Sequence, residues 1–252
     1  IDRSLVGSEI CIRDRHYSFL EFKLKDIYCK SMEILLSAKN ISKTFNKKRV
    51  LEKINIEIRK SEIVAISGAS GAGKTTLLNI LSTLDRPDEN NSSSLFIDNH
   101  EVFDLKKNDL ANFRNQKIGF VFQFHELIPE LNVIENICLP GWIKKDIDVK
   151  KKAKKLLKYF GLQDFADKKP LTLSGGEKQR VAIARSLIND PKIIFADEPT
   201  GNLDSKNSKI LFDLFFKLRD DYDCSVVIVT HDENSANKCD RKLLIVDGKI
   251  KN

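Results

Sequence analysis

The sequence predicts an α/β fold that has a mixed β-sheet core, an antiparallel β layer before it and a helical subdomain inserted into it. Two strand-like segments joined by a turn at Asn46-Lys47-Lys48 predict the antiparallel layer. Two continuous apolar runs, Ile63-Val64-Ala65-Ile66 and Ile193-Ile194-Phe195-Ala196, predict buried parallel strands of the core. Between them, helical patterns dominate from about residue 107 to residue 170, which predicts the inserted subdomain.

Length and composition limit what such a chain can do. Its 252 residues can form one large domain with a substantial core, so one catalytic unit per chain is expected. No apolar run reaches the roughly 18 to 20 residues of a membrane-spanning helix, and we expect membrane association through partners only. The net charge of +7 raises the question of nucleic acid, but the dense run Lys144 to Lys158 alternates with apolar residues at helical spacing. A solvated helix face explains that run better, and we expect no nucleic-acid partner.

We interpret residues 1–31 as a non-native or disordered extension. Met32, the only methionine, opens the strand-like segment Glu33 to Ala38, and we expect the native chain to start there. Residues 1–15 resemble a translated adapter sequence, and residues 16–31 would be upstream read-through. A signal peptide is the competing interpretation, but this segment lacks a basic start, an apolar stretch of about 7 to 15 residues and a small-residue cleavage site. The folded domain is therefore expected to span residues 32–252.

The strongest local signal directly follows the first apolar run. Residues 68–75 read Gly68-Ala69-Ser70-Gly71-Ala72-Gly73-Lys74-Thr75 and fit the phosphate-binding pattern G-x-x-x-x-G-K-[ST]. The glycines lack Cβ atoms, so backbone N–H groups can converge on phosphate oxygens; Lys74 can reach the β- and γ-phosphates, and the Thr75 hydroxyl can hold Mg²⁺. A helix starting at Thr75 and Thr76 aims its positive dipole end at the same anion. A flexible glycine loop that binds nothing is the alternative, but four fixed residues among eight in a strand-loop-helix setting favour a nucleotide site.

The remaining elements follow in order along the chain. Residues 85–94 form a polar loop by composition. The helical stretch from about residue 107 is expected to break at Pro129 and at Pro140-Gly141. After Pro170 the α/β alternation returns, and the predicted elements are a helix over 175–189, a strand over 192–197, a helix over 205–220, a strand over 225–230 and a hairpin near Asp247-Gly248.

A pair of carboxylates ends the second apolar run. Asp197 and Glu198 stand at the end of a predicted central strand, which should stop beside the phosphate-binding loop. Asp197 is placed to bind Mg²⁺ through water, and Glu198 could polarise the water that attacks the γ-phosphate. Taken alone, the pair would be interpreted as strand-end carboxylates in solvent. Together with the loop, it predicts a catalytic site.

Two glycines follow the residue that is expected to cap the predicted helix over 175–189. Ser174 precedes Gly175, Gly176 and a helix with one apolar face, so Ser174 is the expected N-cap. The helix start presents free N–H groups and a positive dipole end to an anion. A plain capped helix needs the serine but not the two glycines after it, which favours a binding role.

Taken together, these motifs in residues 32–252 resemble the ATP-binding cassette (ABC) ATPases, a type of P-loop NTPase whose signature is LSGGQ. Here the signature is Leu173 to Glu177, with glutamate in fifth place, a common variant. The resemblance implies an ATPase that uses ATP and Mg²⁺, with Glu198 as the catalytic base. It also assigns roles to four further residues. Gln123, after the predicted strand Ile118 to Phe122, contacts Mg²⁺ and senses a membrane partner, and His231 contacts the γ-phosphate. Asp204 belongs to the D-loop, and Phe45 stacks on adenine, although an isolated phenylalanine would more often be core.

The same resemblance implies a homodimer. In this family the signature residues, here Ser174, Gly175 and Gly176, act on the ATP held by a second subunit. Two chains would therefore close head to tail around two nucleotides. An isolated chain would lack part of the charge stabilisation of the transition state and would hydrolyse ATP poorly.

The segment Phe120 to Leu131 and the run Leu81 to Pro87 are similar to the LolD family, the ATPases of lipoprotein-releasing LolCDE systems. This implies a peripheral protein at the cytoplasmic face of the bacterial inner membrane, with integral membrane subunits of the LolC/LolE type, that powers release of lipoproteins toward the outer membrane. The alternatives are the ATPase of a MacB-type efflux or FtsE-type division complex and, lower, a soluble non-transport ABC ATPase. One cassette per chain and no long coiled-coil insertion argue against the last. Two departures from the family pattern, Glu89 to Ser94 and Asn99, are expected to lie away from the nucleotide.

Overall fold

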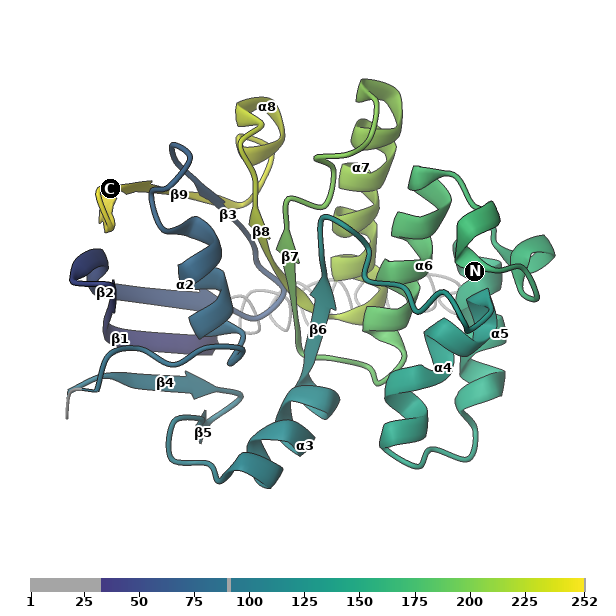
Figure 1. Ribbon diagram of the computed structural model, residues 1–252, viewed down its shortest axis with the longest axis horizontal. Coiled ribbons are helices and arrows are strands. Elements are labelled where there is room, and N and C mark those ends of the chain that lie inside the picture. Colours follow the sequence, from purple (N-terminus) through teal and green to yellow (C-terminus); the bar gives the residue numbers. More distant parts are fainter. Residues whose placement is uncertain (1–32, 90–91, 252) are drawn as a thin grey trace, which may run out of the picture.

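Two β-sheets and a group of helices build the protein (Figure 1). The computed structural model describes residues 33–89 and 92–251, so the interpretation of residues 1–31 and of Met32 concerns a segment outside the described residues. The elements, in chain order, are β1 (Ile34–Phe45), β2 (Lys48–Arg59), β3 (Ile63–Ser67), α2 (Lys74–Leu81), β4 (Ser94–Ile97), β5 (His100–Glu101), α3 (Lys107–Lys117), β6 (Ile118–Val121), α4 (Val133–Ile143), α5 (Val149–Tyr159), the 3₁₀ turns Gln163–Phe165 and Pro170–Thr172, α6 (Gly175–Leu187), β7 (Ile193–Asp197), α7 (Ser205–Tyr222), β8 (Ser225–Val229), α8 (Glu233–Ala236), β9 (Arg241–Val246) and β10 (Lys249–Lys251).

The first sheet is antiparallel and has the order β2-β1-β4-β5. Asn46 and Lys47 join β1 to β2 with φ values of 47° and 66°, and Phe45 pairs with Lys48 across the turn. Two consecutive residues with positive φ give the two-residue hairpin turn whose twist matches that of the strands. The predicted antiparallel layer is thereby confirmed.

The second sheet is the mixed core, with the order β10-β9-β3-β8-β7-β6. All pairs from β9 to β6 are parallel, and β10 is antiparallel to β9. Every residue of β3 and of β8 is buried, as expected for central strands covered on both faces. The carboxyl ends of β3, β7 and β8 lie at one edge of this sheet, where loops can bring side chains together (Figure 1).

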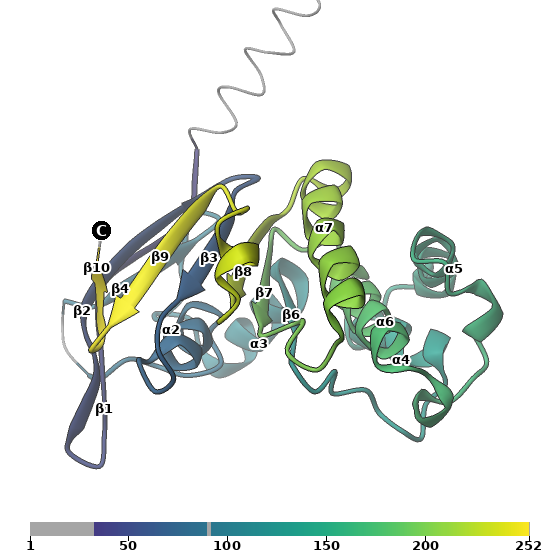
Figure 2. The same cartoon turned by 90° about the horizontal axis from the view of Figure 1, so that it is seen from above.

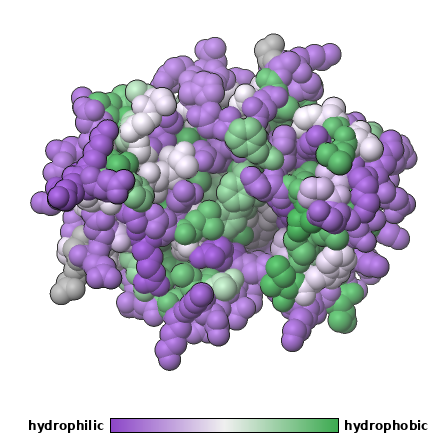
Figure 3. Space-filling view, in the orientation of Figure 1, coloured by the Kyte–Doolittle hydropathy of each residue, from purple (hydrophilic) through white to green (hydrophobic). Residues whose placement is uncertain are grey.

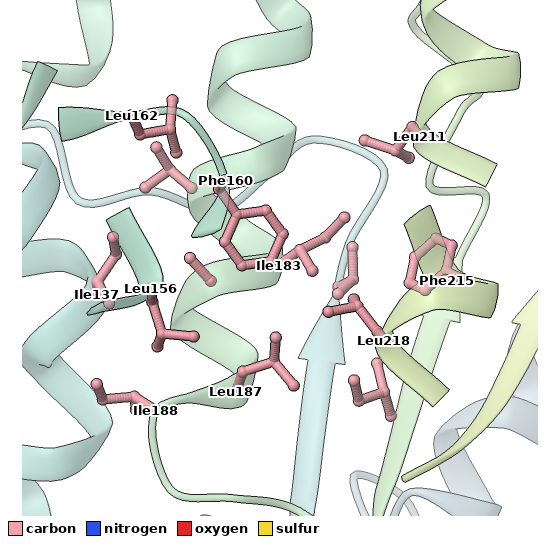
Figure 4. Packing of buried hydrophobic residues seen from close by; sticks show 14 of the residues in the cluster. Ile137, Leu156, Phe160, Leu162, Ile183, Leu187, Ile188, Leu211, Phe215 and Leu218 are labelled. Carbon is pink, nitrogen blue, oxygen red and sulfur yellow. The ribbon is translucent and has the colours of Figure 1, made fainter. Parts of the chain in front are cut away.

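Two hydrophobic clusters hold the layers together. One lies among β1, β2, β3, β4 and α2, and Phe113 of α3 belongs to it. The other lies among α4, α5, α6, α7 and the opposite face of the core sheet. Figure 4 shows side chains of this second cluster, with Ile183 and Leu187 of α6 between Leu156 of α5 and Phe215 of α7. Seen from above, α4, α5 and α6 stand on the side of the core sheet opposite to β1 and β2 (Figure 2).

The prediction of a helix break at Pro140-Gly141 is wrong, because both residues lie inside α4. The helix starts with a capping box between Asn132 and Glu135, which satisfies N–H groups at its first turn. Gly141 packs so closely on α5 that a Cβ there would lie 2.3 Å from Val149 Cγ2. Packing between α4 and α5 thus overrides the local preference of the proline-glycine pair against helix.

The turn between β4 and β5 is formed by Asp98 and Asn99, whose φ values are 49° and 63°. Asparagine tolerates this conformation better than most residues, which explains how Asn99 can stand where glycine is usual. Lys117 Nζ, at the end of α3, donates to Asp98 Oδ2 at 2.7 Å. That hydrogen bond is the largest cause of a lowered pKa for the Asp98 carboxyl.

Asp98→Asn is expected to lower the free energy of unfolding by about 1 kcal/mol at pH 7, because both partners of the ion pair are partly exposed and solvent screens the interaction. A carboxyl whose pKa is depressed in the folded state stabilises the fold above its unfolded pKa, and that contribution is lost as the pH falls through the folded pKa. The penalty should therefore shrink between pH 7 and pH 3 in urea unfolding. Asp104→Asn, at an exposed carboxylate of the following turn, is the control. An equal loss of unfolding free energy at pH 7 and pH 3 would contradict a stabilising ion pair between Asp98 and Lys117.

Candidate nucleotide-binding and hydrolysis site

The phosphate-binding loop connects β3 to α2 and passes tightly between two other strands. Gly68 has φ 147°, and a Cβ there would lie 2.3 Å from the carbonyl oxygen of Ile245 in β9. Gly73 has φ 101° and caps α2, and a Cβ there would lie 2.9 Å from the carbonyl oxygen of Val50 in β2. Lys74 Nζ donates to the carbonyl oxygens of Gly68 and Ala69, each at 3.0 Å. The loop thus curls around the ammonium group of a buried lysine.

A cavity of about 430 Å³ lies beside this loop. Its lining comes from the loop, the start of β2 and the β9–β10 hairpin: Lys48, Arg49, Val50, Ala69, Ser70, Gly71, Ala72, Ile245, Val246, Asp247 and Gly248. Sequence reasoning missed the part played by the hairpin, whose Asp247-Gly248 turn signal gave no indication of a tertiary neighbour. Phe45 is not among the lining residues. It lies at the end of β1 with 46% of its surface exposed, and Lys43 Nζ is 5.2 Å from its ring centroid.

Two oxygen ligands meet at the carboxyl edge of the core sheet. Thr75 Oγ1 donates to Asp197 Oδ1 at 3.3 Å, which links the first turn of α2 to the end of β7. Burial raises the pKa of the Asp197 carboxyl; the Thr75 hydrogen bond opposes that effect, and the charge of Glu198 adds to it. Hydroxyl and carboxylate oxygens are the ligands that Mg²⁺ prefers, so this pair fits that ion. The described residues contain no cluster of three or more His, Cys, Asp or Glu able to hold a metal.

Glu198 and His231 form the next part of the site. Glu198 follows β7 with φ 45°, and its N–H donates to the carbonyl oxygen of Val229 in β8 at 2.9 Å. His231, two residues beyond β8, has its Nδ1 2.5 Å from Glu198 Oε2. The side chain of Glu198 is 21% exposed and that of His231 is 68% exposed. The carboxylate is therefore sheltered, while the imidazole remains accessible to a ligand.

Gln123 lies two residues after β6, and hydrogen bonds hold its backbone and that of the residue before it. Asn202 Nδ2 donates to the Gln123 carbonyl oxygen at 3.1 Å, and a Cβ on Gly201 would lie 3.0 Å from Gln123 Nε2. Gln179 of α6 donates to the Phe122 carbonyl oxygen at 3.4 Å. The structure thus brings Gln123 next to the segment that precedes α7.

Arg185 of α6 fixes the chain just after Gln123. Its guanidinium donates to the carbonyl oxygens of His125 at 2.8 Å and Glu126 at 2.5 Å. Sequence reasoning missed both Arg185 and Gln179. A polar side chain on a helix face that is otherwise apolar was the available signal, and spacing alone could not say what it would bind.

The signature segment stands apart from the phosphate-binding loop of the same chain. Ser174 caps α6, its hydroxyl accepts from the Glu177 N–H at 3.4 Å, and the Glu177 carboxylate accepts from the Ser174 N–H at 2.7 Å. Gly175 and Gly176 lie near Leu203 and Asn207. Figures 1 and 2 show α2 and α6 on opposite sides of β7, so the structure does not bring Ser174 and Lys74 together.

Asp204, from the expected D-loop, caps α7. Its carboxylate accepts from the Asn207 N–H at 2.9 Å and from Asn207 Nδ2 at 2.5 Å, and these hydrogen bonds lower the pKa of Asp204. Asn207 also lies beside Gly176. Asp204 and the signature glycines therefore share a neighbour, and both lie at helix starts.

Comparison with known proteins gives one family. The family model described as ABC transporter matches residues 51–201. The lipoprotein-releasing system ATP-binding protein LolD of Bacteroides thetaiotaomicron is 49% identical over 219 residues, which are 86% of this chain and 99% of that protein. The protein of the same name from Cytophaga hutchinsonii is 48% identical over 221 residues, 87% of this chain and 100% of that protein.

The fold agrees with these matches. A dimeric structure of a post-hydrolysis state of the ATP-binding cassette MJ0796, bound to ADP and Pi, superposes with a TM-score of 0.78 at 41% identity, covering 86% of this chain and 97% of that one. Within the part of the chain that the structure describes, no helix combines the length and hydropathy needed to cross a bilayer. The mixed α/β core with its antiparallel layer confirms the predicted fold class. The chain therefore belongs to the ABC transporter family as an ATP-hydrolysing, nucleotide-binding member, and within that family it resembles the LolD proteins.

Proposed function

We propose that this chain powers the release of lipoproteins from the inner membrane toward the outer membrane, as the ATPase subunit of an ABC transporter. The observation that carries the proposal is the convergence of Thr75, Asp197, Glu198 and His231 at one edge of the core sheet, beside the loop that curls around Lys74. The LolD relatives, which align with this chain along nearly their whole length, supply the transport class.

ATP is proposed to bind with its phosphates along Gly68 to Thr76. The backbone N–H groups of the loop and the start of α2 would face the phosphates, and Lys74 Nζ would turn from the carbonyl oxygens of Gly68 and Ala69 toward phosphate oxygens. Phe45, exposed at the end of β1, is proposed to stack on adenine.

Mg²⁺ is proposed to be held by Thr75 and Asp197, with Gln123 joining from the loop after β6. When bound, the ion neutralises charge that develops on the transferred phosphoryl group. Asn202 binds the carbonyl oxygen of Gln123, and the side-chain amide of Gln123, which makes no hydrogen bond among the described residues, would reorient toward the site.

Glu198 is proposed to accept a proton from the water that attacks the γ-phosphate. His231, 2.5 Å from that carboxylate and mostly exposed, would hold it in place and contact the γ-phosphate. In a homodimer, Ser174, Gly175, Gly176 and Asp204 would complete the nucleotide site of the second copy. Within one chain α2 and α6 lie on opposite sides of β7, which supports that arrangement.

An apolar groove of about 520 Å³ is proposed to receive a segment of the membrane subunits. Its lining comes from α3, β6, the chain that follows β6, α4 and α6. Figure 3 shows hydrophobic surface on both sides of a hollow on this face. Phe122, Glu126 and Arg185 lie in its lining, so a bound segment would contact the chain next to Gln123. We propose that LolC/LolE-like subunits hold the protein at the cytoplasmic face of the inner membrane by this contact. The proposed helical subdomain, at about residues 107–170, would form one wall of the groove.

Ala111→Trp tests this docking surface. Ala111 is exposed on α3 and lines the groove, so a tryptophan would fill space that the partner needs without entering the core. Recovery of membrane subunits with the tagged protein should fall at least about tenfold, while ATP binding by the isolated chain stays unchanged. Asn112→Trp, at the adjacent exposed position outside the groove lining, is the matched control. Equal recovery with both variants would contradict the proposed docking site.

The function is tested by tagging the protein in its native cell, extracting membranes gently and identifying what co-purifies. Two related membrane proteins together with acylated lipoproteins are the expected result. A single efflux-type or division-type membrane protein would move the assignment to the MacB or FtsE relatives, and recovery with no membrane protein would refute the transport role.

A further inference from the structure

The outer face of α5 carries five exposed lysines, Lys150, Lys151, Lys154, Lys155 and Lys158, here called the lysine face. They line one shallow surface depression of about 450 Å³. No ion pair or side-chain hydrogen bond joins any of them to another residue in the part of the chain that the structure describes. By contrast Lys152, on the flank of the same helix, binds Asp146 at 2.8 Å and Asp190 at 3.7 Å.

Repulsion within the lysine face destabilises α5. Three pairs of its lysines stand four residues apart, and like charges at that spacing destabilise a helix. The opposite side of α5 is fixed in the core through Val149, Ala153, Leu156 and Leu157, so the five lysines stay on the exposed side of the helix. A solvated face needs no such concentration of one sign of charge.

Three exposed apolar side chains stand in the chain just before the lysine face. Ile147, two residues before α5, is 96% exposed, and Ile143 and Trp142 at the end of α4 are 65% and 38% exposed. We call these three residues the apolar corner. Lys144 and Lys145, also exposed and without ion pairs among the described residues, stand between them. Residues 142–158 contain two carboxylates. Asp146 binds Lys152, and Asp148 is exposed.

This combination fits an anionic membrane surface better than single-stranded nucleic acid. Lysine ammonium groups next to aliphatic and tryptophan side chains are suited to lipid headgroups and the acyl chains just beneath them. Single-stranded nucleic acid is bound by stacking on aromatic rings and by arginine, and the lysine face has neither. Ile143 also lines the apolar groove, so the corner continues a surface that the proposed membrane subunits would cover.

We propose that the lysine face and the apolar corner bind the anionic phospholipid surface of the membrane directly, with the lysines on the headgroups and Ile147 inserted among them. This contact adds to the proposed function, on which it rests for the orientation of the groove toward the membrane. It adds a direct contact with lipid to the expected association through membrane partners.

Vesicle flotation with the purified full chain tests the proposal. Vesicles of phosphatidylglycerol and phosphatidylethanolamine should bind the protein, pure phosphatidylcholine vesicles should bind it far less, and binding should weaken as salt is raised from about 0.05 to 0.5 M. Replacing all five lysines of the face by glutamine should lower the partition coefficient at least about tenfold. Ile147→Ser, which leaves the charge untouched, should lower it roughly threefold or more.

The matched control removes the same charge elsewhere. Glutamine at the exposed Lys39, Lys53, Lys106, Lys107 and Lys251 lowers the net charge by five, from +7 to +2, as the lysine-face variant does. It should retain binding within about twofold. An equal loss with both five-site variants, no preference for anionic vesicles, or binding of RNA but not of vesicles would overturn the proposal. Recovery of membrane subunits, measured on the same variants, reports on the proposed function separately.

Discussion

Glu198→Gln is expected to reduce ATP turnover by roughly 100-fold to 1000-fold, with ATP binding retained. The amide has the shape of the carboxylate and can still lie against His231, but it cannot accept a proton from attacking water. Because binding and dimer closure precede this step, the variant should accumulate as a nucleotide-bound dimer. Phosphate release by the wild type and the variant, together with nucleotide binding and molecular mass in solution, would measure the three effects.

Glu57→Gln provides the control for the loss of a negative charge. Glu57 is exposed on β2, and its side chain makes no ion pair among the described residues. Turnover should stay within about twofold of wild type. If Glu198→Gln also retained full turnover, Glu198 would not be the base.

Gly68→Ala is expected to lower the free energy of unfolding by about 3 to 5 kcal/mol and to weaken ATP binding at least about tenfold. Two effects add at this position. The backbone has φ 147°, which an L side chain rarely adopts, and the new methyl carbon would lie 2.3 Å from the Ile245 carbonyl oxygen. Since that oxygen belongs to the backbone of β9, the loop itself must shift.

Gly71→Ala separates these two effects. Gly71 also has a positive φ, 77°, but no atom of the described residues lies within 4 Å of the position its Cβ would take. The expected cost is about 1 to 2 kcal/mol, from the backbone conformation alone. Urea unfolding without nucleotide would measure both variants. Equal losses would mean that the contact with β9 contributes nothing.

Local motifs could be interpreted from the sequence because their residues are neighbours along the chain. The phosphate-binding loop, the capped helix start at Ser174 and the hairpin at Asn46 depend on spacing within a few residues, and the structure contains each. The strand order could not be derived in this way. β3 lies between β8 and β9, which are separated from it by more than 150 residues of sequence.

The missed features all depend on tertiary contacts. Pro140 stays helical because α4 is packed between its neighbours, and the β9–β10 hairpin lines the cavity beside the phosphate-binding loop because Gly248 meets the backbone of β2. Arg185 binds the backbone carbonyl oxygens of two residues. Since every residue has such an oxygen, no sequence pattern identifies the two that Arg185 binds. The roles of individual site residues in binding and hydrolysis remain predictions.

Helix α6 is a continuous element of 13 residues, about 20 Å long, without an internal break. Its first turn carries the signature glycines, and its last turns carry Arg185 and Ser186 into the wall of the apolar groove. A helix without an internal break moves as a rigid body. A displacement of the end that lines the groove therefore also displaces the end that carries the signature glycines. A docked partner could therefore adjust how two copies of the protein close, even though it touches neither nucleotide.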